Sequence, residues 1–374
     1  MRVLLSTYGS RGDVEPMVAL AVELQRLGAE VRMCAPPDEE FAKLLAGAGV
    51  PMVPFERPWR SWVRPSTAEE RTRRVADFID AQYDTVAAAA EGCDVLVATA
   101  MSHFVARSVA EKAAISHRCA IFSPSVLDDP DAQNWAALFG PSINSHRATV
   151  GLPPVGDVGE FMFTDRPWLA ADPTLGPWPG PADVDVVQTG AWILPDERML
   201  PAELEAFLDA GTPPVYVGFG SMRAAQDSAR VAIETIRAQG RRTLLAHGWA
   251  ELALVDDRDD CFVVGEVNQQ ALFGRVAAVV HHGGAGTTTT AARAGVPQVV
   301  APQAGGDQPY WAGRVTELGI GAALDGPAPS TDSLSTALTA ALNPETRARA
   351  TAVAGAVRTD GATVAATLVL VGSR

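Results

Sequence analysis

The stretch from His281 to Thr290 combines two histidines, three glycines and four threonines between an apolar run and a helical pattern. Residues 277–280 predict a short buried strand, and residues 291–294 predict the first turns of a helix. N–H groups at a helix N-terminus lack intrahelical acceptors, and the helix dipole favours negative charge there. Glycines let a phosphate approach the backbone, while threonine and histidine supply donors. The stretch therefore predicts an anion site, most naturally for a diphosphate.

Other phosphate motifs fit this chain less well. The stretch has no Gly-Lys-Ser/Thr, which excludes a Walker A loop, and Gly9-Ser10-Arg11-Gly12 does not match the dinucleotide pattern GxGxxG. Asp38, the acid that could mark such a dinucleotide fold, is therefore interpreted as a turn or cap residue. A glycine-rich turn that serves only the fold remains the alternative for residues 281–290.

Composition excludes several classes of protein. The 374 residues suffice for two domains, and 47% hydrophobic with 20% charged residues is typical of a globular enzyme. A net charge of −14 argues against nucleic-acid binding and against general adhesion to anionic membranes. The four cysteines form no CxxC pair, which favours free thiols in a reducing cytoplasm over a zinc site. We find no signal peptide and no apolar run long enough to span a membrane, and expect a cytoplasmic monomer.

Short apolar runs alternate with helical patterns through the chain, which predicts parallel sheets with helices on both faces. Helices are expected from Met17 to Leu27, with Pro16 in the first turn, and at residues 228–239 and 311–318. A segment rich in proline and acidic residues places the domain boundary near residues 195–212, giving domains 1–195 and 196–374. The expected strands are 3–6, 31–35, 95–99, 119–123, 215–219, 243–247, 261–264, 277–280 and 298–301.

Several motifs together resemble a known family. They are Gly9-Ser10-Arg11-Gly12-Asp13, Phe219-Gly220-Ser221, His282-Gly283-Gly284-Ala285-Gly286-Thr287, Pro302-Gln303 and Asp307-Gln308-Pro309. The sequence resembles GT-B glycosyltransferases, and specifically actinomycete enzymes that act on vancomycin- and teicoplanin-type glycopeptide aglycones. Residues 144–147, 187–195 and 263–268 look characteristic of that group. The likeness implies an α/β fold of two facing Rossmann-like, doubly wound domains with an interdomain cleft.

The chain departs from the family pattern in two places. The segment between Ser123 and Asn144 is shorter than in relatives, which puts a loop that is often mobile in doubt. Residues 303–308 hold an extra small residue, which puts the sugar contact of Asp307 in doubt. The resemblance is strongest after residue 185, and the sequence leaves open that the two halves derive from different relatives.

The resemblance makes Asp13 the general base. The attacking hydroxyl must lose its proton, and a positioned base typically contributes about 10²–10⁴-fold to such a step. The structural alternative is a helix cap, because Asp13 lies just before the helix that includes Pro16. The N-terminal domain would bind the acceptor, and the final helix, about 355–374, would pack back on it.

The resemblance assigns the donor site to the C-terminal domain. Trp249 would stack on the nucleobase and Val267 would present its backbone to the base edge, although a core position is the alternative for Trp249. Asp307 and Gln308 would bind the donor sugar. His281 is the least secure diphosphate contact, since it could end the strand facing inward. The residues expected to bind the diphosphate are Ser10, Ser221, His281, His282, Gly284, Gly286 and Thr287.

One basic, aromatic-rich patch lies outside these motifs. It comprises residues 59–64, with Trp59, Arg60, Trp62 and Arg64, followed by Arg71, Arg73 and Arg74. The patch could line the acceptor mouth or touch a membrane surface transiently. A loop followed by a solvated helix face explains it equally well.

The resemblance implies an inverting, metal-independent hexosyltransferase without a cofactor. Its donor would be a UDP- or dTDP-sugar, and its acceptor a hydroxyl of a glycopeptide aglycone. Helix N–H groups and His282 would stabilise the leaving diphosphate. Three alternatives remain open: a transferase for another natural product such as a macrolide or polyketide, a nucleotide-sugar epimerase, and a non-catalytic donor-binding protein.

Overall fold

The computed structural model describes residues 1–61, 67–127, 132–164, 166–180, 185–223, 227–303, 306–326 and 329–372, without the side chains of 68, 71 and 132–136. Trp62, Arg64, the side chain of Arg71 and the extra small residue near 304 therefore lie outside the described residues. Contacts divide the chain into two units. Unit 1 comprises Met1–Asp172, Pro177–Leu194 and Arg358–Arg374, and unit 2 comprises Pro173–Gly176 and Pro195–Val357.

Unit 1 is built on a parallel sheet with β1 near its centre. Its order is β3-β2-β1-β4-β5-β6-β7, so the chain changes direction across the sheet between β1 and β4. Val3 pairs with Val31 on one side and with Val95 on the other. The strands are β1 (Arg2–Tyr8), β2 (Glu30–Ala35), β3 (Met52–Pro54), β4 (Val95–Ala100), β5 (Ser116–Ile121), β6 (Trp168–Leu169) and β7 (Val187–Gln188).

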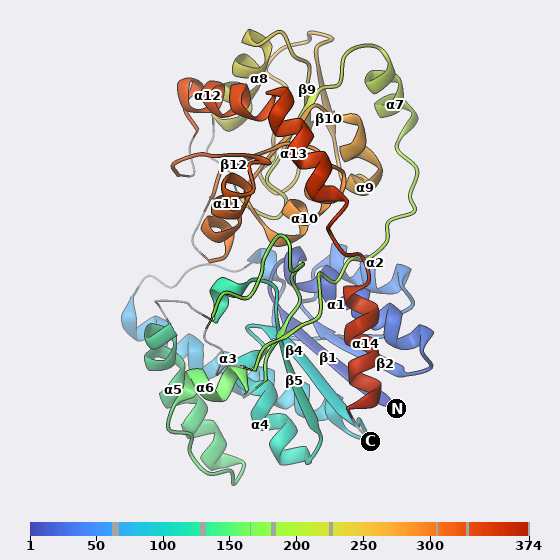
Figure 1. Ribbon diagram of the computed structural model, residues 1–374. Helices are drawn as coiled ribbons and strands as arrows, with labels where there is room; N and C mark the ends of the chain where they lie inside the picture. The colour runs from blue at the N-terminus through green and yellow to red at the C-terminus, as the bar shows by residue number, and fades with distance from the viewer. Residues whose placement is uncertain are drawn as a thin grey trace. The chain divides into compact units, whose positions relative to one another are not determined.

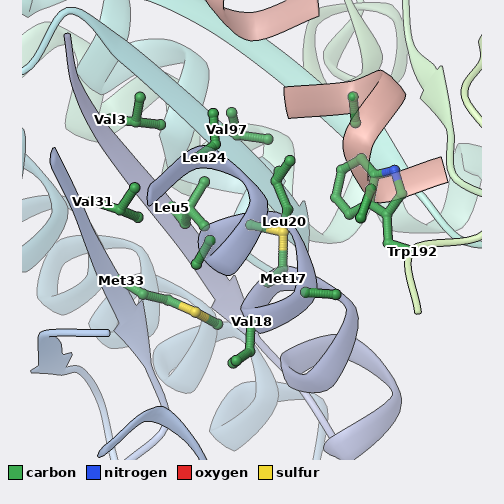
Figure 2. Close-up of a cluster of buried hydrophobic side chains, with 14 of the residues drawn as sticks. Val3, Leu5, Met17, Val18, Leu20, Leu24, Val31, Met33, Val97 and Trp192 are labelled. Carbon is green, nitrogen blue, oxygen red and sulfur yellow. The ribbon is translucent and has the colours of Figure 1, made fainter. Parts of the chain in front are cut away.

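Helices cover both faces of this sheet because successive residues of β1 point to opposite sides. Val3 and Leu5 join the core beneath α1 and α14, where Met17, Leu20 and Trp192 also pack (Figure 2). Leu4 and Tyr8 face the second core, beneath α3 and α4. The helices are α1 (Arg11–Arg26), α2 (Glu39–Gly47), α3 (Ala68–Ala90), α4 (His103–Ala113), α5 (Ala132–Thr149), α6 (Val158–Phe163) and α14 (Gly361–Val371), with 3₁₀ turns η1 (Trp59–Ser61) and η2 (Pro124–Val126).

The C-terminal helix α14 lies beside α1 (Figure 1). Thr363 donates a hydrogen bond to Glu23 of α1 at 2.9 Å. At the start of α14 the chain passes directly against the backbone of Gly190, where a Cβ on Gly361 would meet the Ala191 carbonyl oxygen at 2.4 Å. A glycine is therefore required at 361 for this helix to pack in unit 1.

Helix α1 begins earlier than the sequence predicted. It starts at Arg11, so Pro16 lies inside the helix and the expected start at Pro16 was wrong. Ser10 is the N-cap, and Ser10 with Asp13 forms a capping box that stabilises the first turn. This local capping offsets the hydrogen bond that Pro16 cannot donate.

Unit 2 contains a second parallel sheet, in the order β10-β9-β8-β11-β12-β13. Its strands are β8 (Val215–Gly218), β9 (Thr243–Ala246), β10 (Cys261–Val264), β11 (Ala278–His281), β12 (Gln298–Val300) and β13 (Gly321–Ala323). The helices are α7 (Ala202–Asp209), α8 (Ser228–Ala238), α9 (Gln269–Leu272), α10 (Ala285–Arg293), α11 (Gln308–Glu317), α12 (Thr331–Ala341) and α13 (Pro344–Ala354), with the 3₁₀ turn η3 (Phe273–Arg275). One hydrophobic cluster packs on each face of this sheet.

Two parallel sheets flanked by helices confirm the predicted fold class. The short strands β3, β6, β7 and β13 were not predicted, because two or three residues carry no readable periodicity. Residues 173–176 group with unit 2 because Arg314 of α11 donates to the carbonyls of Leu175 at 2.8 Å and Thr174 at 3.1 Å. None of the described helices is both long and apolar enough to cross a membrane.

Candidate active site

Three turns meet at the carboxyl edge of the unit 2 sheet. They follow the neighbouring strands β9, β8 and β11, and the strand order reverses between β8 and β11. Open α/β sheets bind ligands at such a reversal. Trp249 donates its backbone N–H to the Gly220 carbonyl at 3.0 Å, and a Cβ on Gly220 would lie 3.3 Å from the His282 ring. The sheet topology thus brings Ser221, Trp249 and His282 into one region of unit 2.

The N-terminus of α10 has no side-chain cap. Its N-cap is Gly284, and the first helical hydrogen bond runs from Thr288 N to Gly284 O at 3.0 Å. The N–H groups of Ala285, Gly286 and Thr287 therefore precede the hydrogen-bonded ladder of the helix. No atom of the described residues lies within 4 Å of a Cβ placed on Gly286. This arrangement leaves space and backbone donors for an anion.

His282 lies directly beside this helix start. A Cβ on Gly284 would come within 2.5 Å of His282 Nε2, so only glycine allows the ring this position. His282 Nδ1 is buried without a hydrogen-bond partner among the described residues. Burial lowers the pKa of His282 to about 4, so the imidazole is neutral at pH 7. A neutral imidazole can donate one hydrogen bond at this edge of the site.

His281 faces inward at the end of its strand, the alternative that the sequence left open. It is fully buried at the end of β11, with Nε2 at 2.9 Å from Gln298 Oε1, while Nδ1 accepts the Gly283 N–H at 3.1 Å. Burial lowers its pKa to about 3, with a smaller contribution from His282. Both ring nitrogens are engaged within the protein, so His281 holds the Gly283 turn, and its contact with a diphosphate stays a prediction.

The residues expected at the nucleobase differ in their surroundings. Trp249 is partly exposed on the turn after β9, whereas the Val267 side chain is packed in the core. Gly248, which the sequence did not single out, has a φ of +48° and lies against Gly220, where a Cβ would meet the carbonyl oxygen at 2.9 Å. The signal in the sequence that could have identified Gly248 was its position directly after a strand and before an aromatic residue.

Asp307 and Gln308 lie at the start of α11. Asp307 accepts the indole N–H of Trp311 at 2.9 Å, and burial raises the pKa of its carboxyl. Gln308 Oε1 accepts the Gln303 N–H at 2.8 Å. The carbonyl oxygen of Gln308 also lies 3.1 Å from a Cβ placed on Gly283, so the α11 start and the β11 turn adjoin. The two side chains are thus held by hydrogen bonds beside the turn that follows β11.

In unit 1, Asp13 occupies the third position of α1. Its Oδ2 accepts the backbone N–H of Ser10 at 2.8 Å and the Ser10 hydroxyl at 3.3 Å, while Ser10 Oγ accepts the Gly12 N–H. The cap role that the sequence left open is therefore real, and it fixes the orientation of the carboxylate. Asp13 as a base and Ser10 as a phosphate contact stay predictions.

The Asn144–Arg147 motif serves the fold of unit 1. Asn144 exchanges two hydrogen bonds with the Val155 backbone, at 3.0 and 2.8 Å. Arg147 is 2% exposed and binds Glu111, Ser108 and the Pro153 carbonyl. We find no cluster of acidic, histidine or cysteine side chains suited to a metal within the described ranges.

Two family descriptions match the chain. Residues 3–129 match the glycosyltransferase family 28 N-terminal domain, and residues 253–366 match the erythromycin biosynthesis protein CIII-like, C-terminal domain. The glycotransferase of kitacinnamycin has a similar structure, with a TM-score of 0.79 at 23% identity over 99% of this chain and 98% of that one. This likeness shows the GT-B fold.

Three relatives from Amycolatopsis orientalis match nearly the whole chain. Glycosyltransferase GtfE is 56% identical over 399 residues, covering 98% of this chain and 97% of the relative. Vancomycin aglycone glucosyltransferase is 55% identical over 99% and 97%. The dTDP-epi-vancosaminyltransferase is 53% identical over 94% and 93%.

The alignment with GtfE is longer than the 374 residues of this chain, so that relative has residues without a counterpart here. Residues 128–131, inside the segment expected to be short, lie outside the described residues. Near full-length identity above 50% nevertheless settles the family. The chain belongs to the vancomycin-type group of GT-B glycosyltransferases and is a hexosyltransferase.

Proposed function

We propose that this enzyme transfers a sugar from a UDP- or dTDP-sugar to a hydroxyl of a glycopeptide aglycone, with inversion at the anomeric carbon. Unit 2 would bind the donor and unit 1 the acceptor. The observation that carries this proposal is the uncapped N-terminus of α10 beside His282, whose buried Nδ1 has no partner among the described residues. Two of the relatives are a vancomycin aglycone glucosyltransferase and a dTDP-epi-vancosaminyltransferase, which supports the choice of substrates.

In the proposed reaction the acceptor oxygen attacks the anomeric carbon as its proton passes to Asp13. The bond between the anomeric carbon and the diphosphate oxygen breaks, and the nucleoside diphosphate leaves with the electron pair. The N–H groups of residues 285–287 and His282 would stabilise the charge that develops on the diphosphate. Ser221 would add a hydroxyl, Trp249 would stack on the base, and Asp307 with Gln308 would bind sugar hydroxyls.

The proposal also covers the cellular compartment, the oligomeric state and the need for a cofactor or metal. All four cysteines are buried and unpaired, as is usual in a reducing compartment, which supports a cytoplasmic enzyme. We propose a monomer that needs neither a cofactor nor a metal. Size-exclusion chromatography with light scattering would test whether the protein is a monomer. Unchanged turnover in EDTA would support independence of a metal.

The decisive experiment is turnover of a panel of UDP- and dTDP-sugars with vancomycin and teicoplanin aglycones, measured by mass spectrometry. We expect one donor and one aglycone to give a product heavier by one sugar residue. Transfer only to a macrolide or polyketide would contradict the proposed acceptor class. Isomerised donor without transfer would indicate an epimerase, and donor binding without any turnover would indicate an auxiliary protein.

Calorimetry tests the donor site separately. His282→Ala should weaken UDP or dTDP binding by at least roughly tenfold, since a hydrogen bond to a charged group is lost. His146→Ala is the matched control, because this histidine of unit 1 pairs with Asp80. Equal affinities in the two variants would contradict the assigned phosphate contact.

A further inference from the structure

The segment Arg57–Ser61, here called the η1 segment, follows β3 and is fixed by an aspartate distant in sequence. Asp38 is 5% exposed, and its carboxylate accepts the backbone N–H of Trp59 at 2.6 Å and of Arg60 at 3.0 Å. Asp38 is also the N-cap residue of α2, yet its side chain makes no cap hydrogen bond to that helix. A carboxylate in this position would ordinarily cap its own helix. Here it caps η1 instead.

The same segment is attached to the end of β1. The Tyr8 hydroxyl donates to the Arg57 carbonyl at 3.0 Å, and the Tyr8 ring meets the Trp59 ring edge-on at 5.5 Å between centroids. Tyr8 is fully buried and is the last residue of β1. Two residues later the chain reaches Ser10, whose backbone N–H binds the Asp13 carboxylate. The η1 segment and the proposed base therefore share one rigid anchor, Tyr8.

The surface of the η1 segment suits a planar, polar acceptor. Arg57, Arg60 and Ser61 are exposed, and Trp59 is partly exposed. A guanidinium group stacks on aromatic rings and binds carboxylates, and an indole edge offers apolar contact. These side chains form a basic, aromatic surface in a chain whose net charge is −14. Phenolic rings and a carboxylate on the acceptor would match this chemistry.

We propose that Asp38 is a positioning residue for acceptor selection, which it achieves by holding the η1 segment beside the Asp13 turn as part of the acceptor surface. This inference rests on the proposed function, because it assumes that unit 1 binds the acceptor. Asp38 is buried, so it is assigned no direct contact with substrate. Its effect passes through two backbone hydrogen bonds to Trp59 and Arg60, so its loss should change acceptor binding and leave donor binding intact.

The test compares Asp38→Ala and Asp38→Asn with wild type. Asp38→Ala should raise the acceptor KM by roughly tenfold or more, since two charge-assisted hydrogen bonds that hold the segment are lost. The affinity for dTDP or UDP, measured by calorimetry, should stay within about twofold, because the proposed donor site lies in unit 2. Asp38→Asn retains one acceptor oxygen and should give an intermediate KM. Tyr8→Phe keeps the ring, loses the bond to the Arg57 carbonyl, and should shift KM in the same direction by less.

Asp94→Ala provides the matched control. Asp94 accepts the Arg2 backbone N–H at 2.7 Å, so it is also an aspartate that binds a distant backbone group, but at the amino edge of the same sheet. It should lower thermal stability without changing the acceptor KM. An unchanged acceptor KM in Asp38→Ala, or a parallel loss of donor and acceptor binding, would overturn the inference. A wild-type enzyme that transfers no sugar would instead overturn the proposed function.

Discussion

The turns after β1 and β11 both contain glycine, but the helices that follow them are capped differently. Both lie next to the strand reversal of their sheet, and both lead into a helix. The N-terminus of α1 is closed by its own capping box, in which Asp13 supplies a negative charge. The N-terminus of α10 has glycine as its cap and a neighbouring histidine whose buried Nδ1 has no partner in the part of the chain that the structure describes.

This difference in capping suits the α1 turn and the α10 turn to different chemistry. A carboxylate at a helix start already satisfies the dipole and repels a second anion, so the α1 turn suits a base. An uncapped start with open space suits a diphosphate. The proposal that unit 2 binds the donor rests on the α10 start together with His282, because other helices, such as α4 of unit 1, also lack a side-chain cap hydrogen bond.

Of the changes that test this comparison, removing the charge of Asp13 should have the largest effect on the rate of sugar transfer. Asp13→Asn keeps an oxygen that can accept the Ser10 N–H, so the capping box and the fold should persist. Transfer should fall by about 10²–10⁴-fold because the acceptor hydroxyl loses its base. Single-turnover kinetics with saturating donor would measure the loss. Residual transfer near the wild-type rate would reduce Asp13 to a helix cap.

Placing an acid on α10 should make the turn after β11 resemble the turn after β1, which has Asp13 at its helix start. Gly286→Asp adds a carboxylate where a Cβ meets nothing within 4 Å, and it should stabilise the helix by roughly 0.3–1 kcal/mol. The same charge should weaken nucleoside diphosphate binding by about 10- to 100-fold. Gly286→Ala is the control for size alone and should bind more tightly than Gly286→Asp. Equal binding in both variants would place the diphosphate elsewhere.

The smallest expected effect is a dependence of donor binding on pH. The pKa of His282 is about 4, well below the ordinary value, so the ring binds no proton at neutral pH in the free enzyme. A bound diphosphate should raise this pKa, so donor affinity should increase a few-fold as pH falls from about 7.5 to 6. Calorimetry in buffers of different ionisation enthalpy would detect the proton taken up.

The variant His282→Gln is the control for protons taken up by the diphosphate itself. Identical proton uptake in the variant and the wild type would exclude His282 as the group that is protonated. Stability of the free enzyme should change in the opposite direction. The buried histidines 281 and 282 resist protonation when folded, so stability is full above about pH 6.5 and declines as pH falls toward 4.

The sequence predicted those parts of the site that depend on local pattern. The run before His281 and the glycines after it indicated a strand, a turn and a helix start, because each signal lies within a few residues. Alternating apolar runs likewise indicated two parallel sheets. The start of α1 was misplaced because the capping box of Ser10 and Asp13 outweighs the usual effect of a proline within a helix.

Contacts between distant segments had no such signal. His281 and His282 are adjacent and chemically identical, yet the strand points one inward to Gln298 and leaves the other beside Gly220 and Gly284. Asp38 was correctly interpreted as a cap, but its target 21 residues away depends on how β2 and β3 pair. The sequence alone determined the chemical groups, the family and the alternation of strands and helices that gives two parallel sheets. Only the tertiary structure decided which polar groups are used up within the fold and which remain for a ligand, because hydrogen-bond pairing depends on neighbours in space.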